Sequence, residues 1–316
     1  MPPDATPRRG AAQRGEVSEA GHTVLSVLKG AEQWLQKRNV DAPRRSAELL
    51  LGHVLGMSRL QLYLAHDRPL DERERTAMRG LLQRRGHGEP VAYLLGSWSF
   101  RGLELAVSPA VLIPRPETEE LVSLALERAP QGARVLDLGT GSGAIAIALA
   151  VERPDLAVVA VDTSQNALAV AAANVQRHGV AARVALRRGS WWEPIAADER
   201  FDLVVANPPY IDPAAPVGLA DDVKNFEPPL ALYSAAGDPA SCYRAIAAGL
   251  AGHLVPDGWI VTEAGLAAVA AARACFAATP GLAAVDVLAD LSGAPRFVVA
   301  QCDPAQRAPR ADVLAT

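Results

Sequence analysis

A buried strand that ends in two prolines constrains this chain more than any other stretch. Residues 201–210 read FDLVVANPPY, and the short apolar run at 203–206 predicts a buried strand rather than a helix. Pro208 and Pro209 lack the backbone N–H that a central strand needs, so the chain must leave the sheet there. Asn207 and Tyr210 are then fixed at the carboxyl end of a strand, where open α/β sheets bind ligands.

The residues of this turn suit a guest that carries an amide or amino nitrogen. The Asn207 side chain can accept one N–H and can also donate a hydrogen bond. The carbonyl groups of Pro208 and Pro209 remain acceptors on a backbone whose φ is locked, and Tyr210 can stack on a planar group. A turn that binds nothing is the competing interpretation, because Asn-Pro pairs are common in turns.

The second half of the chain alternates between strand-like and helical segments. This alternation predicts an α/β fold with a doubly wound, mostly parallel sheet of about seven strands. The expected strands are residues 134–138, 157–161, 184–186, 203–206, 259–262, 284–288 and 297–300. The expected helices between them are residues 144–151, 165–178, 240–254 and 266–278.

The first half divides into segments of different character. Residues 1–21 are rich in Pro, Gly and charged residues and are expected to form a disordered lead. In residues 22–94 apolar positions recur every three or four residues, which predicts a bundle of about four helices, with Asp71 as a candidate helix cap. Alternating apolar positions around Arg101-Gly102 predict a hairpin linker over 95–116. The α/β domain is expected over 117–301, and 302–316 as a tail.

A glycine-rich loop follows the first strand of the α/β domain. Gly139, Thr140, Gly141, Ser142 and Gly143 lie between the expected strand and helix, where glycines permit a tight turn and close approach of a ligand. Asp162 ends the next strand and is placed to accept hydrogen bonds from ribose hydroxyls. The loop also fits the G-x-G-x-x-A pattern of NAD enzymes, so a dehydrogenase stays open on these residues alone.

Two adjacent tryptophans follow the third strand. Exposing both Trp191 and Trp192 in a loop is costly, so at least one should cover a flat group such as adenine. Trp191 is the better candidate, and packing in the core is the alternative for both.

Composition limits the classes of binding partner and the cellular compartment that suit this chain. A net charge of −4 and a pI near 5.9 argue against binding nucleic acid mainly through phosphate charge. Three widely spaced cysteines without a C-x-x-C pair suit a reducing compartment and no metal site. No apolar run reaches the ~20 residues of a membrane span, and no secretory signal is recognisable. The cytoplasm is therefore expected.

With the GTGSG loop on the first strand of the α/β domain, Asp162 on the second and NPPY on the fourth, the chain resembles the protein-(glutamine-N5) methyltransferases that modify peptide-chain release factors. The resemblance extends over roughly residues 23–301. It includes LIPRPETEELV at 112–122, the preceding G-x-W-x-F, FEPPLAL at 226–232, PDGWIVTEAG at 256–265 and DLSGAPR at 290–296. Ser190, the stretch after Gly265 and the segment SAAGDPASCYR depart from the usual pattern of that family.

The resemblance implies a Rossmann-like methyltransferase domain that uses S-adenosylmethionine, and it implies roles for individual residues. The glycine loop would hold the methionine part, Asp162 the ribose and Trp191 the adenine. Asn207 and the Pro208 carbonyl would hold the side-chain amide of a glutamine in a Gly-Gly-Gln loop. Tyr210 would pack on that amide, with Pro209 completing the turn, and Phe100 would close the site near the sulfonium. The helical domain would dock the release factor.

Other functions remain compatible with the motifs. An amino methylase acting on adenine or on a small-molecule amide would use the same turn, because a flipped base fits NPPY equally well. A NAD oxidoreductase and a non-catalytic binding module that keeps the loop are the remaining alternatives.

Overall fold

The computed structural model describes residues 22–215 and 218–304, and the expected disordered lead and most of the expected tail lie outside this range. The chain divides into two compact units, Met1–Gly86 and His87–Thr316. They are described separately. None of the described helices is both long and apolar enough to cross a membrane.

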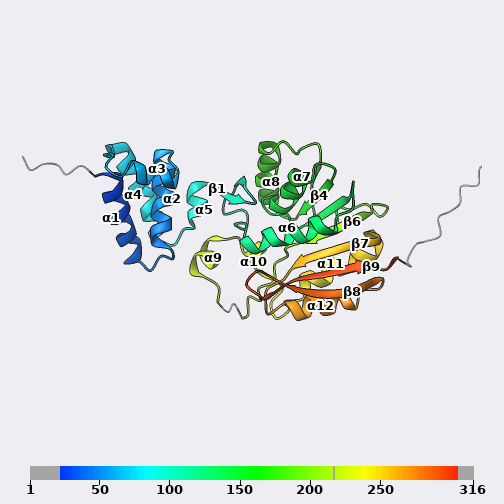
Figure 1. Ribbon diagram of the computed structural model, residues 1–316. Helices are drawn as coiled ribbons and strands as arrows, with labels where there is room; N and C mark the ends of the chain where they lie inside the picture. Colours follow the sequence, from blue (N-terminus) through cyan, green and yellow to red (C-terminus); the bar gives the residue numbers. More distant parts are fainter. Residues whose placement is uncertain (1–21, 216–217, 305–316) are drawn as a thin grey trace, which may run out of the picture. The chain divides into compact units, whose positions relative to one another are not determined.

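The first unit contains four helices in its described part: α1 Val24–Gln36, α2 Pro43–Leu55, α3 Arg59–Leu64 and α4 Glu72–Gly86 (Figure 1). Asp71 caps α4 as predicted, because its Oδ1 accepts from the Glu74 backbone N–H at 2.8 Å. Ser58 and Gln61 form a capping box at the start of α3. Val24, Leu28, Ala31 and Leu35 give α1 one buried face at helical spacing.

A short helix and a hairpin open the second unit. Helix α5 (Val91–Leu95) packs with this unit, since its Ala92 and Tyr93 share a buried cluster with Val107. The helical domain expected to end at residue 94 thus differs from the compact unit, which ends at Gly86. The hairpin pairs β1 (Ser97–Phe100) with β2 (Leu103–Ala106). Its turn is Arg101-Gly102, both with positive φ.

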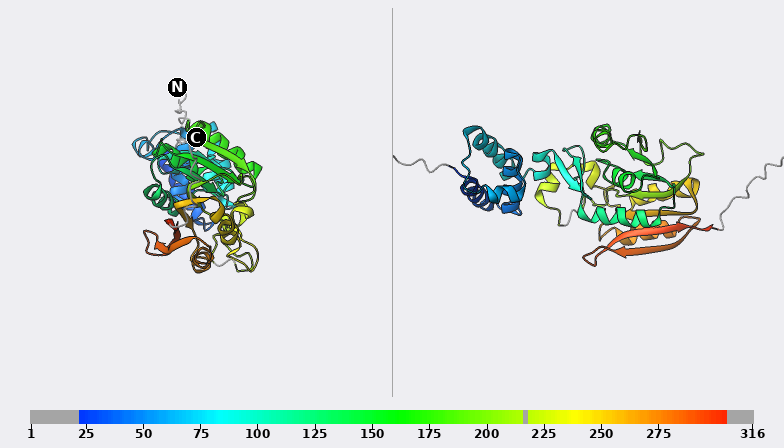
Figure 2. Two further views of the ribbon diagram at one scale, coloured as in Figure 1. Left: turned by 90° about the vertical axis from the view of Figure 1, so that its right-hand side faces the viewer. Right: turned by 45° about the horizontal axis from the view of Figure 1, so that its top comes forward.

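The predicted seven-stranded sheet is confirmed, with order β5-β4-β3-β6-β7-β9-β8. Strands β3 to β7 pair in parallel, whereas β9 is antiparallel to both β7 and β8. Strand β8 forms one edge (orange in Figure 2). The strands are β3 Arg134–Leu138, β4 Ala157–Asp162, β5 Val184–Arg188, β6 Phe201–Ala206, β7 Leu254–Glu263, β8 Leu282–Ala289 and β9 Pro295–Cys302.

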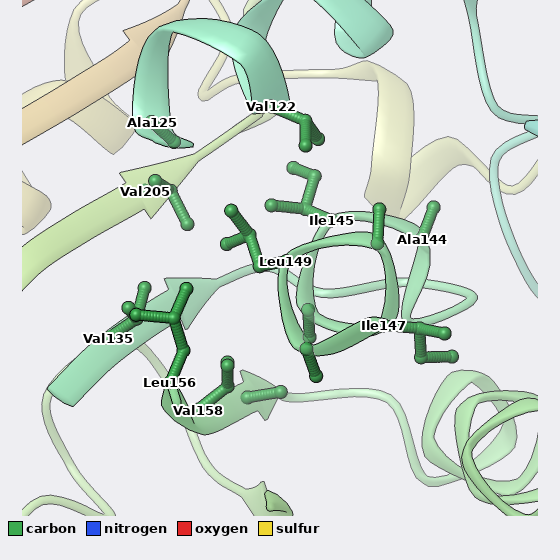
Figure 3. Close-up of a cluster of buried hydrophobic side chains, with 14 of the residues drawn as sticks. Val122, Ala125, Val135, Ala144, Ile145, Ile147, Leu149, Leu156, Val158 and Val205 are labelled. Atoms are coloured by element: carbon green, nitrogen blue, oxygen red, sulfur yellow. The ribbon is translucent and has the colours of Figure 1, made fainter. Parts of the chain in front are cut away.

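Helices cover both faces of this sheet. The cluster on one face joins α6 (Pro116–Arg128) and α7 (Ala144–Glu152), with Val175 from α8 (Gln165–Arg177), to Val135, Val205 and other inward residues (Figure 3). The other face packs α11 (Ser241–His253) and α12 (Val269–Ala277) on alternate residues of the same strands, such as Leu136 and Val204. Because the parallel strands are covered on both faces, they consist mainly of apolar residues.

Several boundaries differ from the predicted ones. Strand β7 begins at Leu254 instead of residue 259, and its pairing with β6 is irregular between Phe201 and Leu203. Helix α12 begins only at Val269, because residues 265–268 form a turn that leaves Leu266 68% exposed. Two short helices were not predicted: α9 (Asp221–Phe226) and α10 (Pro229–Leu232). Strand β9 continues to Cys302, one residue into the expected tail.

Candidate active site

The candidate site is a cavity of about 570 Å³ at the carboxyl edge of β3, β4 and β6. The strand order reverses at β3, since β4 lies on one side and β6 on the other, and such switch points are where doubly wound sheets bind ligands. Most of the predicted site residues line this cavity: Gly139, Thr140, Gly141, Ser142, Asp162, Trp191, Asn207 and Pro209.

The glycine loop has a backbone that other residues would strain. Gly139, Gly141 and Gly143 have φ of 81°, 57° and 82°, a region that L side chains rarely adopt. Gly143 is the N-cap of α7, and a Cβ there would lie 2.9 Å from Ile147 Cδ1. The loop thus brings bare backbone and the start of a helix to the cavity wall.

Asp162 is the one charged side chain among the described residues that line the cavity. Its Oδ2 accepts from the Gly141 backbone N–H at 2.9 Å and its Oδ1 from that of Ser164 at 2.8 Å. These bonds couple the end of β4 to the glycine loop. Burial raises the pKa of Asp162 above its usual value.

Asp137, at the penultimate position of β3, is fully buried beneath the loop. Its Oδ2 accepts from the Thr140 hydroxyl at 2.6 Å, while its Oδ1 has no partner within residues 22–215 and 218–304. Burial raises the pKa of Asp137 to about 7. The carboxyl group fixes Thr140 and so supports the loop from below.

Asn207 reaches the cavity with its amide already oriented. Its Nδ2 donates to Thr118 Oγ1 at 3.1 Å, and Thr118 in turn donates to Glu263 Oε2 at 2.7 Å. No hydrogen bond is made to Asn207 Oδ1 by any residue in the described part of the chain. The amide oxygen is therefore available to accept an N–H from a ligand.

Four predicted site residues do not line the cavity. Gly143 and Pro208 lie beside it in the loop and the turn, Pro208 being buried. Tyr210 is partly buried against Gly265, and burial raises its pKa to about 12. Phe100 is 1% exposed in a buried cluster that includes Leu105 and the cavity-lining Ala144 and Ile145, and its place near the sulfonium stays a prediction.

The two tryptophans have different positions. Trp191 lines the cavity with a φ of 50°, a strained conformation that turns the loop at this point. Trp192 instead packs inward: its Nε1 donates to the Ile246 carbonyl at 2.9 Å, and its ring stacks on His253 at 5.0 Å. The assignment of Trp191 as the ligand-facing residue remains a prediction.

Two walls of the cavity were not identified as such from the sequence. One is the segment after the hairpin, and the other is the region around α10. Together they contribute Pro109, Ala110, Val111, Leu112, Pro114, Thr118, Pro228, Leu230, Ala231, Tyr233 and Cys242. FEPPLAL was noted only as part of a resemblance, since its residues carry no chemical signature.

Glu227 holds these two walls together. Its side chain is 1% exposed, its Oε2 accepts from the Ile113 backbone N–H at 3.1 Å, and its Oε1 pairs with Arg115 at 2.5 Å. Burial raises the pKa of Glu227 although Arg115 opposes the shift. A buried carboxylate with both oxygens engaged fixes the segment that leads into α6.

The lining fits a nucleoside-type ligand with a positive charge. The volume lies within the ~300–1,000 Å³ of small-molecule sites. One carboxylate stands at a strand end near the glycine loop, and the described lining residues include no Lys or Arg to neutralise a diphosphate. No cluster of His, Cys, Asp or Glu that could hold a metal occurs among the described residues. The Asn207 amide lines the same cavity and would face such a ligand.

Two family models match parts of the chain. Residues 26–96 match the PrmC N-terminal domain, and residues 118–220 match the methyltransferase small domain.

Curated relatives match over most of the chain. The chain is 44% identical to the release factor glutamine methyltransferase of Geobacter sulfurreducens, over 77% of this chain and 84% of that one. It is 42% identical to the protein of that name from Nitratidesulfovibrio vulgaris, over 88% and 95%. The match from Bordetella pertussis is 46% identical over 81% and 93%.

Proposed function

The chain belongs to the release factor glutamine methyltransferase family and is thus a methyltransferase, and on this premise we propose that it methylates a peptide-chain release factor. The methyl group of S-adenosylmethionine is transferred to the side-chain amide nitrogen of a glutamine in a Gly-Gly-Gln loop. The helical unit docks the protein substrate. The reaction takes place in the cytoplasm.

One observation carries this proposal: the Asn207 amide and the glycine loop share one cavity, and Asn207 Oδ1 is available as an acceptor. An acceptor beside a cofactor seat suits an incoming –NH2 group, which must be held by its hydrogens so that its nitrogen faces the methyl carbon. The Pro208 carbonyl is the second acceptor in the proposal, at a backbone position with locked φ.

The cofactor seat is proposed from the lining residues. The backbone of Gly139–Gly143 holds the methionine part, Asp162 accepts from the ribose hydroxyls, and Trp191 covers the adenine. When bound, S-adenosylmethionine supplies a methyl group on a sulfonium, whose positive charge is compatible with a lining that holds one carboxylate.

Positioning is the chemical task of these residues. An amide nitrogen is a weak nucleophile because its lone pair is delocalised into the carbonyl group. Holding both of its hydrogens would orient the nitrogen toward the methyl group, and orientation of this kind can supply up to ~7–11 kcal/mol. S-adenosylmethionine would supply that methyl group, with its S–C bond breaking as the N–C bond forms, and would leave as a neutral thioether. The acceptors stabilise the positive charge that develops on nitrogen, and its extra proton leaves to water.

Incubation with methyl-labelled S-adenosylmethionine and purified release factor tests the proposal. The expected result is one label on the glutamine of the Gly-Gly-Gln loop, located by peptide mass spectrometry. A release factor with that glutamine replaced by alanine is the control and should take no label. Label in adenine-containing nucleic acid, with none in release factor, would instead support the alternative substrate.

A further inference from the structure

We propose that Glu263 is a positioning residue, which acts through Thr118 to fix the Asn207 amide with its oxygen toward the substrate. This inference rests on the proposed function, because it deepens the role of Asn207. Glu263 ends β7, Thr118 lies in the first turn of α6 and Asn207 follows β6. Consecutive hydrogen bonds therefore connect residues from three separate elements.

The direction of the hydrogen bonds determines which way the amide points. An ionised Glu263 can only accept, so the Thr118 hydroxyl must donate its single hydrogen to Oε2, at 2.7 Å. Thr118 Oγ1 is then an acceptor toward Asn207, which must present Nδ2 to it, at 3.1 Å. The amide oxygen is left on the opposite side, available to the substrate.

Protonation of Glu263 would release this constraint. A protonated carboxyl can donate to Thr118 Oγ1, which frees the hydroxyl hydrogen of Thr118 to donate to Asn207 Oδ1. The amide could then turn over and present Nδ2 to the substrate, where a second donor would face the hydrogens of the –NH2 group. Asn207 would thus lose the acceptor that the reaction requires.

Because Glu263 is buried, its protonation, and with it the reorientation of the Asn207 amide, is expected near neutral pH. Glu263 is 2% exposed, and burial raises its pKa to about 7. The charged groups around it act in both directions: Arg296 on β9 and Arg115 before α6 lower its pKa, whereas Glu117 in the first turn of α6 raises it.

Two tyrosines complete the surroundings of Glu263. Tyr243 from α11 donates its hydroxyl to the Glu263 backbone carbonyl at 3.1 Å, which holds the end of β7. Tyr210 follows β6, and burial together with the proximity of Glu263 raises the pKa of its phenol. Both phenols remain neutral near pH 7, so Glu263 is the group in this cluster whose charge changes there.

Substitution of Thr118 removes the link without removing the carboxylate. In Thr118→Val, turnover should fall about 10- to 100-fold, the size of effect seen in metal sites when a hydrogen-bond partner that orients a ligating side chain is removed. The affinity for S-adenosylmethionine should change far less than turnover. Thr118→Ser keeps the hydroxyl and should restore most of the turnover.

Thr262→Val is the matched control. Thr262 is buried like Thr118 and is adjacent to Glu263. Its hydroxyl donates to the Val298 carbonyl at 3.2 Å and takes no part in the hydrogen bonds that lead to Asn207. Its turnover should equal that of the wild type. Equal turnover of Thr118→Val and Thr262→Val would overturn the inference.

The pH profile separates positioning from a merely structural role. Wild-type turnover should rise with pH through about 7 as Glu263 ionises, and Glu263→Gln should lose this rise. A rise at the same midpoint in Glu263→Gln would overturn the inference even if Thr118→Val failed to fold. Failure of the wild type to label release factor at all would overturn the proposed function, and this inference with it.

Discussion

Tyr210 lies so close to Gly265 that a side chain on Gly265 would collide with its ring. A Cβ there would lie 2.7 Å from both Cδ2 and Cε2 of Tyr210. The Tyr210 ring therefore packs directly on the backbone of Gly265, two residues after the end of β7. The position of the NPPY turn depends on a glycine 55 residues further along the chain.

Gly265→Ala is expected to displace Tyr210 and reduce turnover. The φ of Gly265 is not in the positive region, so the backbone tolerates alanine and the effect comes from the ring contact. Overpacking of this kind costs about 1–3 kcal/mol, so the melting temperature should drop, and turnover should fall while cofactor affinity is retained. Gly252→Ala is the control, because nothing lies within 4 Å of a Cβ at that position. Unchanged turnover in Gly265→Ala would contradict the role of the ring.

Asn207→Ala is expected to keep S-adenosylmethionine binding and to lose most turnover. The side chain is proposed to hold the substrate amide, and loss of one such electrostatic contact costs about 10²–10³-fold in other enzymes. Isothermal titration with the cofactor and single-turnover labelling of release factor separate the two effects. Turnover near that of the wild type would refute the proposed grip on the amide.

The Arg115–Glu227 pair provides a test of the cavity wall. Arg115→Met leaves the Glu227 carboxyl buried without its partner, and breaking a buried pair in this way costs about 3–5 kcal/mol. Because Arg115 is partly exposed, the lower end of that range is expected. The double variant Arg115→Met with Glu227→Gln should regain much of the loss, since no buried charge remains. Urea unfolding of both variants measures the difference, and equal stabilities would contradict this account.

The sequence predicted the sheet well because its strands are buried on both faces. Apolar runs such as 134–138 and the breaks at Gly139 and Pro208 follow from local chemistry, and the predicted cofactor loop, Asp162, Trp191 and Asn207 converge on one cavity. The burial of Phe100 could not be predicted, because strand alternation does not tell which face of a hairpin is covered.

The partners that orient Asn207 could not be predicted in this way. Thr118 and Glu263 lie 89 residues before and 56 residues after it. The acids and proline around Thr118 are explained by ordinary helix-start chemistry, since Pro116 is the first residue of α6 and Glu117 and Glu119 lie in its first turn. A hydroxyl in a first helical turn carries no local signal of its distant contacts, so only the packing of α6 against β6 and β7 identifies it.

The free energy of unfolding should depend on the titration of Glu263 between pH 4.5 and 7. Its pKa is raised from 4.5 to about 7 in the folded state, so within this window the folded chain binds a proton that the unfolded chain has released. The free energy of unfolding then falls as pH rises, by up to about 1.4 kcal/mol per pH unit from this group. Glu263→Gln removes the titration and should show a smaller fall over the same window, measured by urea unfolding at pH 5 and pH 7. Asp137, whose pKa is also raised to about 7 by burial, contributes the same slope in both proteins, so the difference between them isolates Glu263. A wild type and variant with parallel stability curves would show that Glu263 titrates as it does in the unfolded chain.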